Sequence, residues 1–161
     1  MKIYVSIARQ ELQWRAASGP CLRSWPVSTS RFGVGSVPHS QCTPLGRFRI
    51  AQKIGHGAPL HTRFVGRRPV GLWQPSSAAE DGVLTRILWL EGLDADNANT
   101  FSRYIYIHGT NQEDLLGQPA SHGCIRLGNQ AVIELFDLAE LGTLVEIEAE
   151  PPPLTDFAQT L

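Results

Sequence analysis

Apolar and polar residues alternate in several short segments of the chain, and this two-residue period is typical of β-strands with one buried face. The alternation, together with one continuous apolar run at 84–90, predicts strands over residues 2–7, 11–15, 23–30, 47–51, 84–90, 104–107 and 143–147. The first two strands are expected to form a hairpin. Pro26 inside the third segment indicates an edge strand or a bulge, because proline has no N–H to donate.

One segment has the period of a helix instead. Over Asn129–Leu141, apolar side chains recur at helical spacing, and Gly142 follows as a stop signal. The residues expected on the buried face are Val132, Leu135, Phe136, Leu138 and Ala139. Residues 55–79 show little periodicity and are rich in Gly, Pro, His and Arg, so we expect a long irregular excursion of the kind that forms lids or binding loops.

These elements predict a mainly β fold with a minor α component: a mixed β-sandwich or barrel-like sheet with one helix near the C-terminus. A chain of 161 residues is most simply one domain and is long enough to bury a core without disulfides or metal. We assign residues 1–150 to a single domain. Pro151-Pro152-Pro153 opens a Pro-rich tail, 151–161, which we expect to be extended.

Charge and targeting signals narrow the classes of partner. The net charge is −1, so no basic field draws the protein to nucleic acid or to anionic lipid. The first residues form a short apolar stretch broken by Ser6 and Arg9, unlike a secretory leader, and no window is apolar enough for membrane insertion. We therefore expect a cytoplasmic location if the chain is complete, and a periplasmic one if a leader was removed. Cys21 and Cys42 either pair or, as we favour, are small buried hydrophobes.

The richest chemistry lies in the run from Ser121 to Leu127, with His108 upstream of it. Cysteine reacts only as thiolate, so Cys124 needs a base nearby, and His108 and His122 are the candidates. His108 ends a predicted strand, which anchors its ring. Gly123 leaves backbone N–H groups free to face an oxyanion, and the positive end of the helix at Asn129 is expected to favour the thiolate by about 0.3–1 kcal/mol. These are the parts of a cysteine acyl-transfer site.

The span Tyr104–Leu127 resembles the catalytic signature of the L,D-transpeptidase (YkuD-like) family: a histidine, a spacer, then Ser-His-Gly-Cys, an apolar residue and Arg. Twelve residues separate His108 from Ser121, a spacer slightly shorter than the family pattern. Thr43-Pro44-Leu45-Gly46-Arg47-Phe48 also resembles the family's Thr-Pro-x-Gly-x-Phe segment. The likeness covers most of the chain and implies the L,D-transpeptidase catalytic fold.

The resemblance implies a bacterial enzyme that attacks the L,D bond between diaminopimelate and the terminal D-Ala of peptidoglycan stem tetrapeptides. Cys124 would be the nucleophile that forms a thioester, His108 the base, and the Gly109 carbonyl the group that orients the His108 ring. The oxyanion and substrate-binding residues would be Ser121, His122, Gly123 and Arg126. Backbone N–H groups around His122, Gly123 and Cys124 would form the oxyanion hole, and Arg126 would organise the loop or meet a substrate carboxylate. The expected partners are stem peptides or muropeptides, and carbapenems as covalent inhibitors; no cofactor or metal is expected.

Several alternatives stay open. Release of the thioester to water gives an L,D-carboxypeptidase of muropeptide recycling, which the lack of a recognisable leader favours; release to an amine gives cross-linking or D-amino-acid exchange. His122 is a less favoured base than His108. A catalytically silent module that binds wall peptides is a rival class. A zinc site from His108, His122 and Cys124 matches the usual ligand spacing poorly.

Overall fold

The computed structural model describes residues 1–75 and 81–150 of the chain. The expected tail at 151–161 and the last residues of the expected excursion lie outside these ranges. The described elements are β1 (Lys2–Ser6), β2 (Glu11–Arg15), β3 (Cys21–Ser28), β4 (Gly46–Ile54), β5 (Thr62–Val65), β6 (Arg68–Leu72), β7 (Val83–Gly92), the 3-10 helix η1 (Ala95–Asn97), β8 (Tyr106–Gly109), the 3-10 helix η2 (Glu113–Leu115), β9 (Ile125–Leu127), α1 (Asn129–Leu138) and β10 (Leu144–Glu148).

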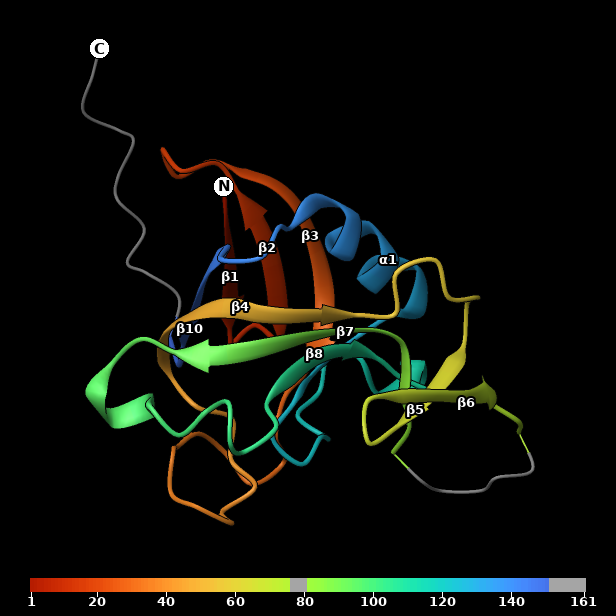
Figure 1. Cartoon of the computed structure of the whole chain (residues 1–161). Helices are drawn as coiled ribbons and strands as arrows, with labels where there is room; N and C mark the ends of the chain where they lie inside the picture. The colour runs from red at the N-terminus through yellow and green to blue at the C-terminus, as the bar shows by residue number, and fades with distance from the viewer. Residues whose placement is uncertain (76–80, 151–161) are drawn as a thin grey trace.

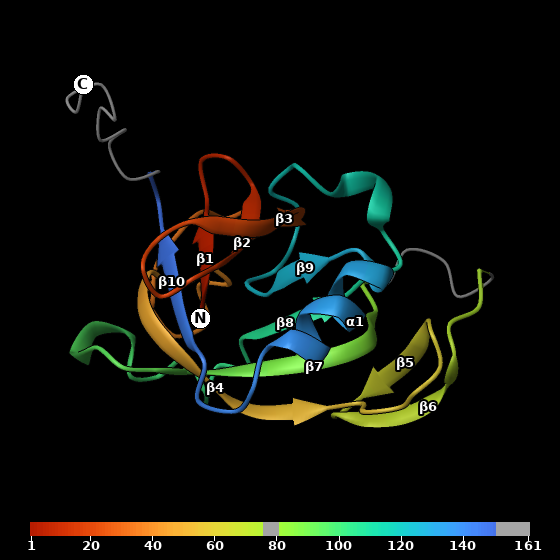
Figure 2. The ribbon, with the colours of Figure 1, turned by 90° about the horizontal axis from the view of Figure 1, so that it is seen from above.

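The strands form one sheet that closes on itself. The order is β4-β10-β1-β2-β3-β9-β8-β7-β5-β6, and β4 also pairs with β7, so the first eight strands make a closed ring and the β5–β6 hairpin extends from β7 (Figures 1 and 2). The β1–β10 and β8–β9 pairs are parallel, and the other pairs are antiparallel. The predicted barrel-like mixed sheet with one late helix is confirmed.

The main core fills the inside of the ring and includes one face of α1. Val132, Leu135 and Phe136 of α1 belong to the same buried cluster as residues of the strands, and the helix packs against β7 and β8 (Figure 2). The helix is three residues shorter than predicted, because Ala139 is already extended and the following chain pairs with β4 through Ile50. Leu138 was expected on the buried face, but it is 40% exposed.

The expected irregular excursion at 55–79 contains a regular hairpin, β5–β6, which pairs with β7 through β5. Gly66 and Arg67 make its turn with positive φ angles. The sequence pattern hid β6, because all five of its residues are exposed and Pro69 and Gly71 interrupt any alternation. The prediction of an irregular segment was therefore wrong for residues 62–72, whereas residues 55–61 and 73–75 lie in no strand or helix.

Two details of the strands differ from the sequence prediction or qualify it. β9 was not predicted, since three residues are too few to show a period. Pro26 lies in β3, which is an interior strand paired with β2 and β9. The Val27 N–H donates to Gln10 on the β2 side, so the Pro26 nitrogen faces the other side, just beyond the two residues that pair with β9. On the β9 side, Pro26 therefore has no paired strand beside it, as at the edge of a sheet.

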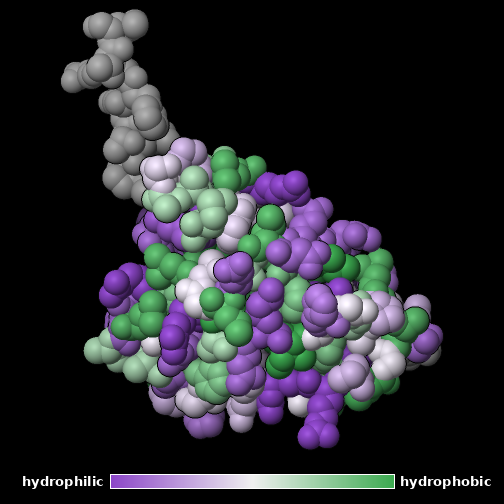
Figure 3. Space-filling model, turned by 45° about the horizontal axis from the view of Figure 1, so that its top comes forward, coloured by the Kyte–Doolittle hydropathy of each residue, from purple (hydrophilic) through white to green (hydrophobic). Residues whose placement is uncertain are grey.

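Three surface properties of the described residues bear on the sequence predictions. Polar and apolar residues are interspersed over the face shown in Figure 3. None of the described helices is long and apolar enough to cross a membrane. All three cysteines are free, and Cys21 is exposed, so the interpretation of Cys21 as a buried hydrophobe was wrong.

Candidate active site

The parallel pair β8–β9 places the two motif segments side by side. Its register joins Ile107 to Ile125 and His108 to Arg126. Ile107 and Ile125 point into the main core, and successive residues of a strand point to opposite faces. His108 and Arg126 therefore lie on the outer face, and Cys124, one residue before β9, shares that face. Folding thus brings the expected nucleophile and base to one surface of the sheet.

The thiol of Cys124 is half-buried and held by backbone groups of the strand beside it. The Tyr106 N–H donates to Sγ at 3.4 Å, and Sγ contacts the Tyr104 carbonyl at 3.4 Å. Burial raises the pKa of Cys124 to about 11; the Asp81 charge adds to this, while the Tyr106 N–H and the nearby Arg126 and Arg103 oppose it. Cys124 is therefore a neutral thiol at rest, and among the described residues Sγ makes no hydrogen bond to His108.

The ring of His108 is oriented by its own strand. His108 is 1% exposed, and its Nδ1 lies 2.5 Å from the Gly109 carbonyl oxygen. The carbonyl can only accept, so the proton sits on Nδ1 and Nε2 keeps a free lone pair. Burial lowers the pKa of His108, against the charge of Asp81 and the Gly109 hydrogen bond. A neutral imidazole with a free Nε2 is suited to accept a proton.

Gly109 is held against a buried polar cluster that leaves no room for a side chain. A Cβ at this position would meet Asn129 Oδ1 at 2.4 Å and the Leu84 carbonyl at 2.7 Å. The Asn129 amide accepts from Thr85 Oγ1 at 2.6 Å and donates to the Thr110 carbonyl at 2.8 Å. The position of the Gly109 carbonyl, and through it that of the His108 ring, is thus set by close packing.

Hydroxyl groups of Ser121 and Thr43 hydrogen-bond to the backbone of the loop before β9. Ser121 Oγ accepts from the Gly123 N–H at 3.2 Å and donates to the Cys124 carbonyl at 2.7 Å. Gly123 has φ +127, a conformation that favours glycine. Thr43, from the Thr-Pro-x-Gly-x-Phe segment, donates to the Gly123 carbonyl at 2.9 Å. Because its N–H is committed to Ser121, Gly123 is not a free oxyanion donor, and the N–H groups of His122 and Cys124 are the remaining candidates of the expected set.

The helix does not assist the thiol as expected. β9 separates Cys124 from α1, which adds about 10 Å of strand. The Asn129 N–H at the start of α1 donates to Glu113 Oε1 at 2.8 Å. The helix dipole acts only within the first turn, so the expectation that it favours the Cys124 thiolate was wrong.

The ring of His122 contacts Asp81 and Arg31 rather than Cys124. It is exposed, its Nδ1 lies 3.7 Å from Asp81 Oδ2, and its Nε2 contacts Arg31 Nη2. Among the described residues it makes no hydrogen bond to Cys124. The geometry therefore favours His108 over His122 as the base.

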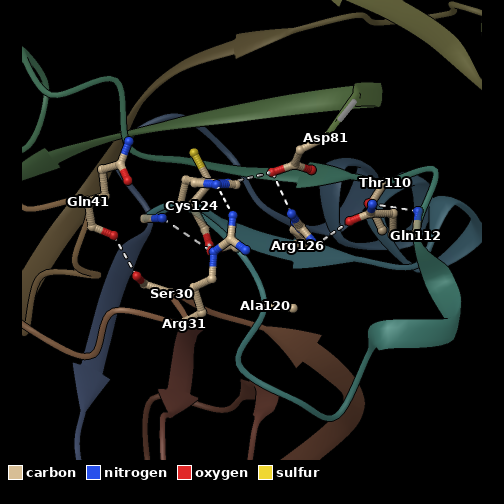
Figure 4. A network of polar contacts seen from close by, with 12 residues as sticks. Ser30, Arg31, Gln41, Asp81, Thr110, Gln112, Ala120, Cys124 and Arg126 are labelled. Carbon is tan, nitrogen blue, oxygen red and sulfur yellow. Dashed lines mark hydrogen bonds and ion pairs between the residues drawn. The ribbon is translucent and has the colours of Figure 1, made fainter. Parts of the chain in front are cut away.

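Arg126 is buried in the outer face of the sheet, at 1% exposure. Its Nη2 pairs with Asp81 Oδ2 at 2.6 Å, and its Nη1 donates to Gln112 Oε1 at 3.0 Å (Figure 4). The sequence reasoning found Arg126 but missed Asp81 and Gln112. An arginine between two apolar residues signals that a carboxylate must be near, but it does not say which one.

Two cavities flank His122. One, of about 420 Å³, is lined by residues that include Gln41, Arg103, Tyr104 and Ile105. The other, of about 310 Å³, is lined by residues that include Arg31, Asp81, Gln112 and Arg126. Over residues 1–75 and 81–150, no three His, Cys, Asp or Glu side chains are grouped so as to hold a metal ion.

Comparison with known proteins shows the family to which the chain belongs. The model of the L,D-transpeptidase catalytic domain (YkuD) matches residues 1–147. The Bacillus subtilis protein named "Putative L,D-transpeptidase YqjB" is 44% identical over 59 residues, which are 37% of this chain and 32% of that protein. The Escherichia coli K12 protein named "Probable L,D-transpeptidase YbiS" is 42% identical over 53 residues, or 33% of this chain and 17% of that protein.

Solved structures share the fold. An L,D-transpeptidase from Mycobacterium smegmatis superposes with a TM-score of 0.59 at 18% identity, covering 91% of this chain and 58% of that one. The structure of LdtMt1 in complex with imipenem gives a TM-score of 0.56 at 21% identity, covering 91% of this chain and 57% of that one. The matches span about a third or less of the two curated relatives and under three fifths of these two solved chains.

Proposed function

Because this chain belongs to the family of L,D-transpeptidase catalytic domains, we propose that it transfers acyl groups of peptidoglycan stem peptides through a thioester on Cys124. The observation that carries the proposal is the placement of Cys124 and of a neutral, oriented His108 on one outer face of the β8–β9 pair. The bond attacked is the L,D bond between diaminopimelate and the terminal D-Ala of a tetrapeptide.

The first half of the reaction uses the two neutral groups. Sγ turns from the Tyr104 carbonyl towards the substrate and attacks the scissile carbonyl carbon as its proton passes to His108 Nε2. The backbone N–H groups of His122 and Cys124 stabilise the oxyanion. The C–N bond then breaks, His108 returns the proton to the leaving amine, and the thioester and free D-Ala result. The Gly109 carbonyl stabilises the imidazolium that forms in between.

The acceptor that attacks the thioester in the second half of the reaction distinguishes a transpeptidase from a carboxypeptidase. An amine of a second stem peptide, deprotonated by His108, attacks the thioester and gives a cross-link, which is L,D-transpeptidation. The names of the relatives favour this outcome. Water in place of the amine gives an L,D-carboxypeptidase, which is the second candidate and would fit free muropeptides in the cytoplasm. Cross-linking would need access to the wall polymer outside the membrane.

The nucleophile is tested by covalent labelling. A carbapenem is expected to add its mass to the intact protein, and Cys124→Ala is expected to abolish the adduct. Cys42→Ala is the matched control, because the hydrogen bonds of this half-buried thiol within the described residues go to the backbone carbonyls of Phe32 and Ser40. An unlabelled wild-type protein would favour a module that only binds wall peptides. An adduct that survives in Cys124→Ala would refute Cys124 as the nucleophile.

The fate of the thioester is tested with a disaccharide tetrapeptide followed by mass spectrometry. A dimer, or exchange of D-Ala for an added D-amino acid, supports transfer. Loss of D-Ala alone supports the carboxypeptidase. An intact tetrapeptide after long incubation, with the protein still acylated by the carbapenem, would contradict this choice of substrate.

A further inference from the structure

A polar cavity is lined by Arg126, the residue that pairs with His108 across the β8–β9 strands. Its volume is about 310 Å³, and its lining includes Arg31, Asp81, Gln112, His122 and Arg126. On the premise of the acyl transfer proposed above, we propose that this cavity is the subsite for the free carboxylate of the leaving residue. Arg31 is its main ligand, and the Asp81 carboxylate holds the Arg126 end of the cavity in the free protein.

The cavity has an excess of positive charge and is therefore suited to bind an anion. Two guanidinium groups, of Arg31 and Arg126, face one carboxylate, that of Asp81, and Asp81 is already paired with Arg126. Among the described residues Arg31 has no carboxylate partner; its side chain contacts the ring of His122 and lies over the ring of Phe32. A planar guanidinium that has no carboxylate partner and lines a cavity matches a carboxylate in both charge and geometry.

The ion pair between Arg126 and Asp81 leaves two buried polar atoms without a hydrogen bond among the described residues. Arg126 is 1% exposed, and its Nε has no hydrogen-bond partner within the described residues. The same holds for Asp81 Oδ1. Buried polar atoms are nearly always partnered, so these two atoms mark a place where the fold leaves hydrogen-bonding capacity unused. Figure 4 shows the Asp81 carboxylate directed at Arg126, in the position that a substrate carboxylate would approach.

The register of the strands assigns this cavity to the leaving group. His108 must return its proton to the leaving amine, and its cross-strand partner is Arg126, which lines this cavity. The Cys124 thiol instead contacts Tyr104, which lines the other cavity, of about 420 Å³. The acyl part of the peptide therefore extends over the Tyr104 side and the leaving residue over the Arg126 side. In a terminal D-Ala, a single Cα separates the carboxylate from the scissile nitrogen. When that nitrogen lies at His108, the carboxylate can therefore reach the cavity lined by Arg126.

The test compares two tetrapeptides that differ only at the terminus, a free D-Ala carboxylate and a D-Ala carboxamide. Wild-type protein is expected to prefer the carboxylate by about tenfold or more in kcat/KM, the factor that one good charged contact supplies. Arg31→Gln is expected to lose most of this preference by slowing only the carboxylate peptide, and Arg31→Lys to regain part of it. Arg49→Gln, which removes an exposed arginine paired with Glu91 on the β4–β7 strands, is the matched control and should keep the wild-type preference.

Asp81→Asn tests the second half of the proposal. Removing the charge that pairs with the Arg126 guanidinium is expected to lower the KM for the carboxylate peptide more than the KM for the carboxamide peptide. A melting curve on the same sample shows that the variant is folded. An equal KM change for both peptides would refute the role of Asp81.

The outcomes separate this proposal from the one on which it rests. If the carbapenem labels Cys124 but wild-type protein cleaves both peptides equally, the carboxylate subsite is refuted and the acyl transfer stands. The same conclusion follows if Arg31→Gln slows both peptides by the same factor. If no adduct forms on Cys124, both proposals fail together.

Discussion

The two faces of the β8–β9 pair are made by alternate residues of the same two strands, and they differ in chemistry rather than in burial. On the inner face, Ile107, Ile125 and Leu127 have no exposed surface and belong to the main core. On the outer face, His108 and Arg126 are each 1% exposed. An apolar face requires only matching volume from its neighbours, whereas each buried polar group requires a particular partner.

The outer face obtains its partners from the adjacent residue of its own strand and from two segments elsewhere in the chain. Gly109 supplies a carbonyl to His108, and Asp81 and Gln112 supply acceptors to Arg126. The inner face therefore positions the strands, and the outer face positions charged and proton-transferring groups. Substitutions on the two faces should separate stability from activity.

The largest separation is expected between neighbouring residues of β8. His108→Gln removes the base, so carbapenem acylation of Cys124 should slow by about 10²–10⁴-fold, with the melting temperature nearly kept. Ile107→Ala deletes a fully buried core side chain and should cost about 2–5 kcal/mol of unfolding free energy, while the folded fraction still acylates at a near wild-type rate. Stopped-flow acylation and urea unfolding measure the two quantities. If His108→Gln and Ile107→Ala lost similar amounts of acylation rate and of unfolding free energy, the two faces would not differ in this way.

Gly109→Ala should damage both properties at once, because the new Cβ meets Asn129 Oδ1 and the Leu84 carbonyl. We expect a destabilisation of about 1–3 kcal/mol from overpacking and slower acylation from a displaced His108. Gly128→Ala is the control: φ is −59, and the nearest atom to its Cβ is Leu116 Cδ1 at 3.7 Å. A Gly109→Ala protein with wild-type unfolding and wild-type acylation would show that the close packing behind His108 is not needed.

The pH dependence of stability should report the burial of His108. Burial lowers its pKa in the folded protein, whereas the unfolded chain keeps the ordinary value of about 6.5. Below that pH the unfolded state binds the proton first, so this contribution to stability is present at pH 7 and is lost as the pH falls through 6.5 towards the lowered value. Urea midpoints between pH 7.5 and pH 5 should therefore fall more steeply for wild type than for His108→Gln. Equal slopes would mean that His108 is not desolvated.

The smallest effect is expected at the border of the outer face. Tyr106→Phe removes a hydroxyl that accepts from Arg67 Nη1 at 3.3 Å and leaves the ring stacked edge-on with Trp89. Arg67 is partly exposed and its guanidinium also lies over the Trp89 ring, so the loss of this one hydrogen bond should change the unfolding free energy by less than about 1 kcal/mol. Thermal unfolding measures it. A larger loss would show that the contact between the β5–β6 hairpin and the sheet is held by this one hydrogen bond.

Sequence reasoning reached the outer face only in part. It identified Cys124, His108 and Arg126, because rare residue types in a tight motif are visible without a structure. It missed Arg31, Asp81 and Gln112, which are single polar residues in unremarkable surroundings. It also placed Cys124 near a helix end, because β9 is too short to show a period, and it took the β5–β6 hairpin for irregular chain, because β6 has no buried face.

The amino-acid sequence by itself determined the strands with one buried face, the single helix and the residues able to form a thioester. These properties depend on side-chain type and on periods of two or 3.6 residues, which are local. The tertiary structure decided which residues share a face: the parallel register of β8 and β9, the closure of β4 on β7 and the pairing of Asp81 with Arg126. These contacts join residues far apart in the chain, so they form and stabilise the fold only when the sheet closes.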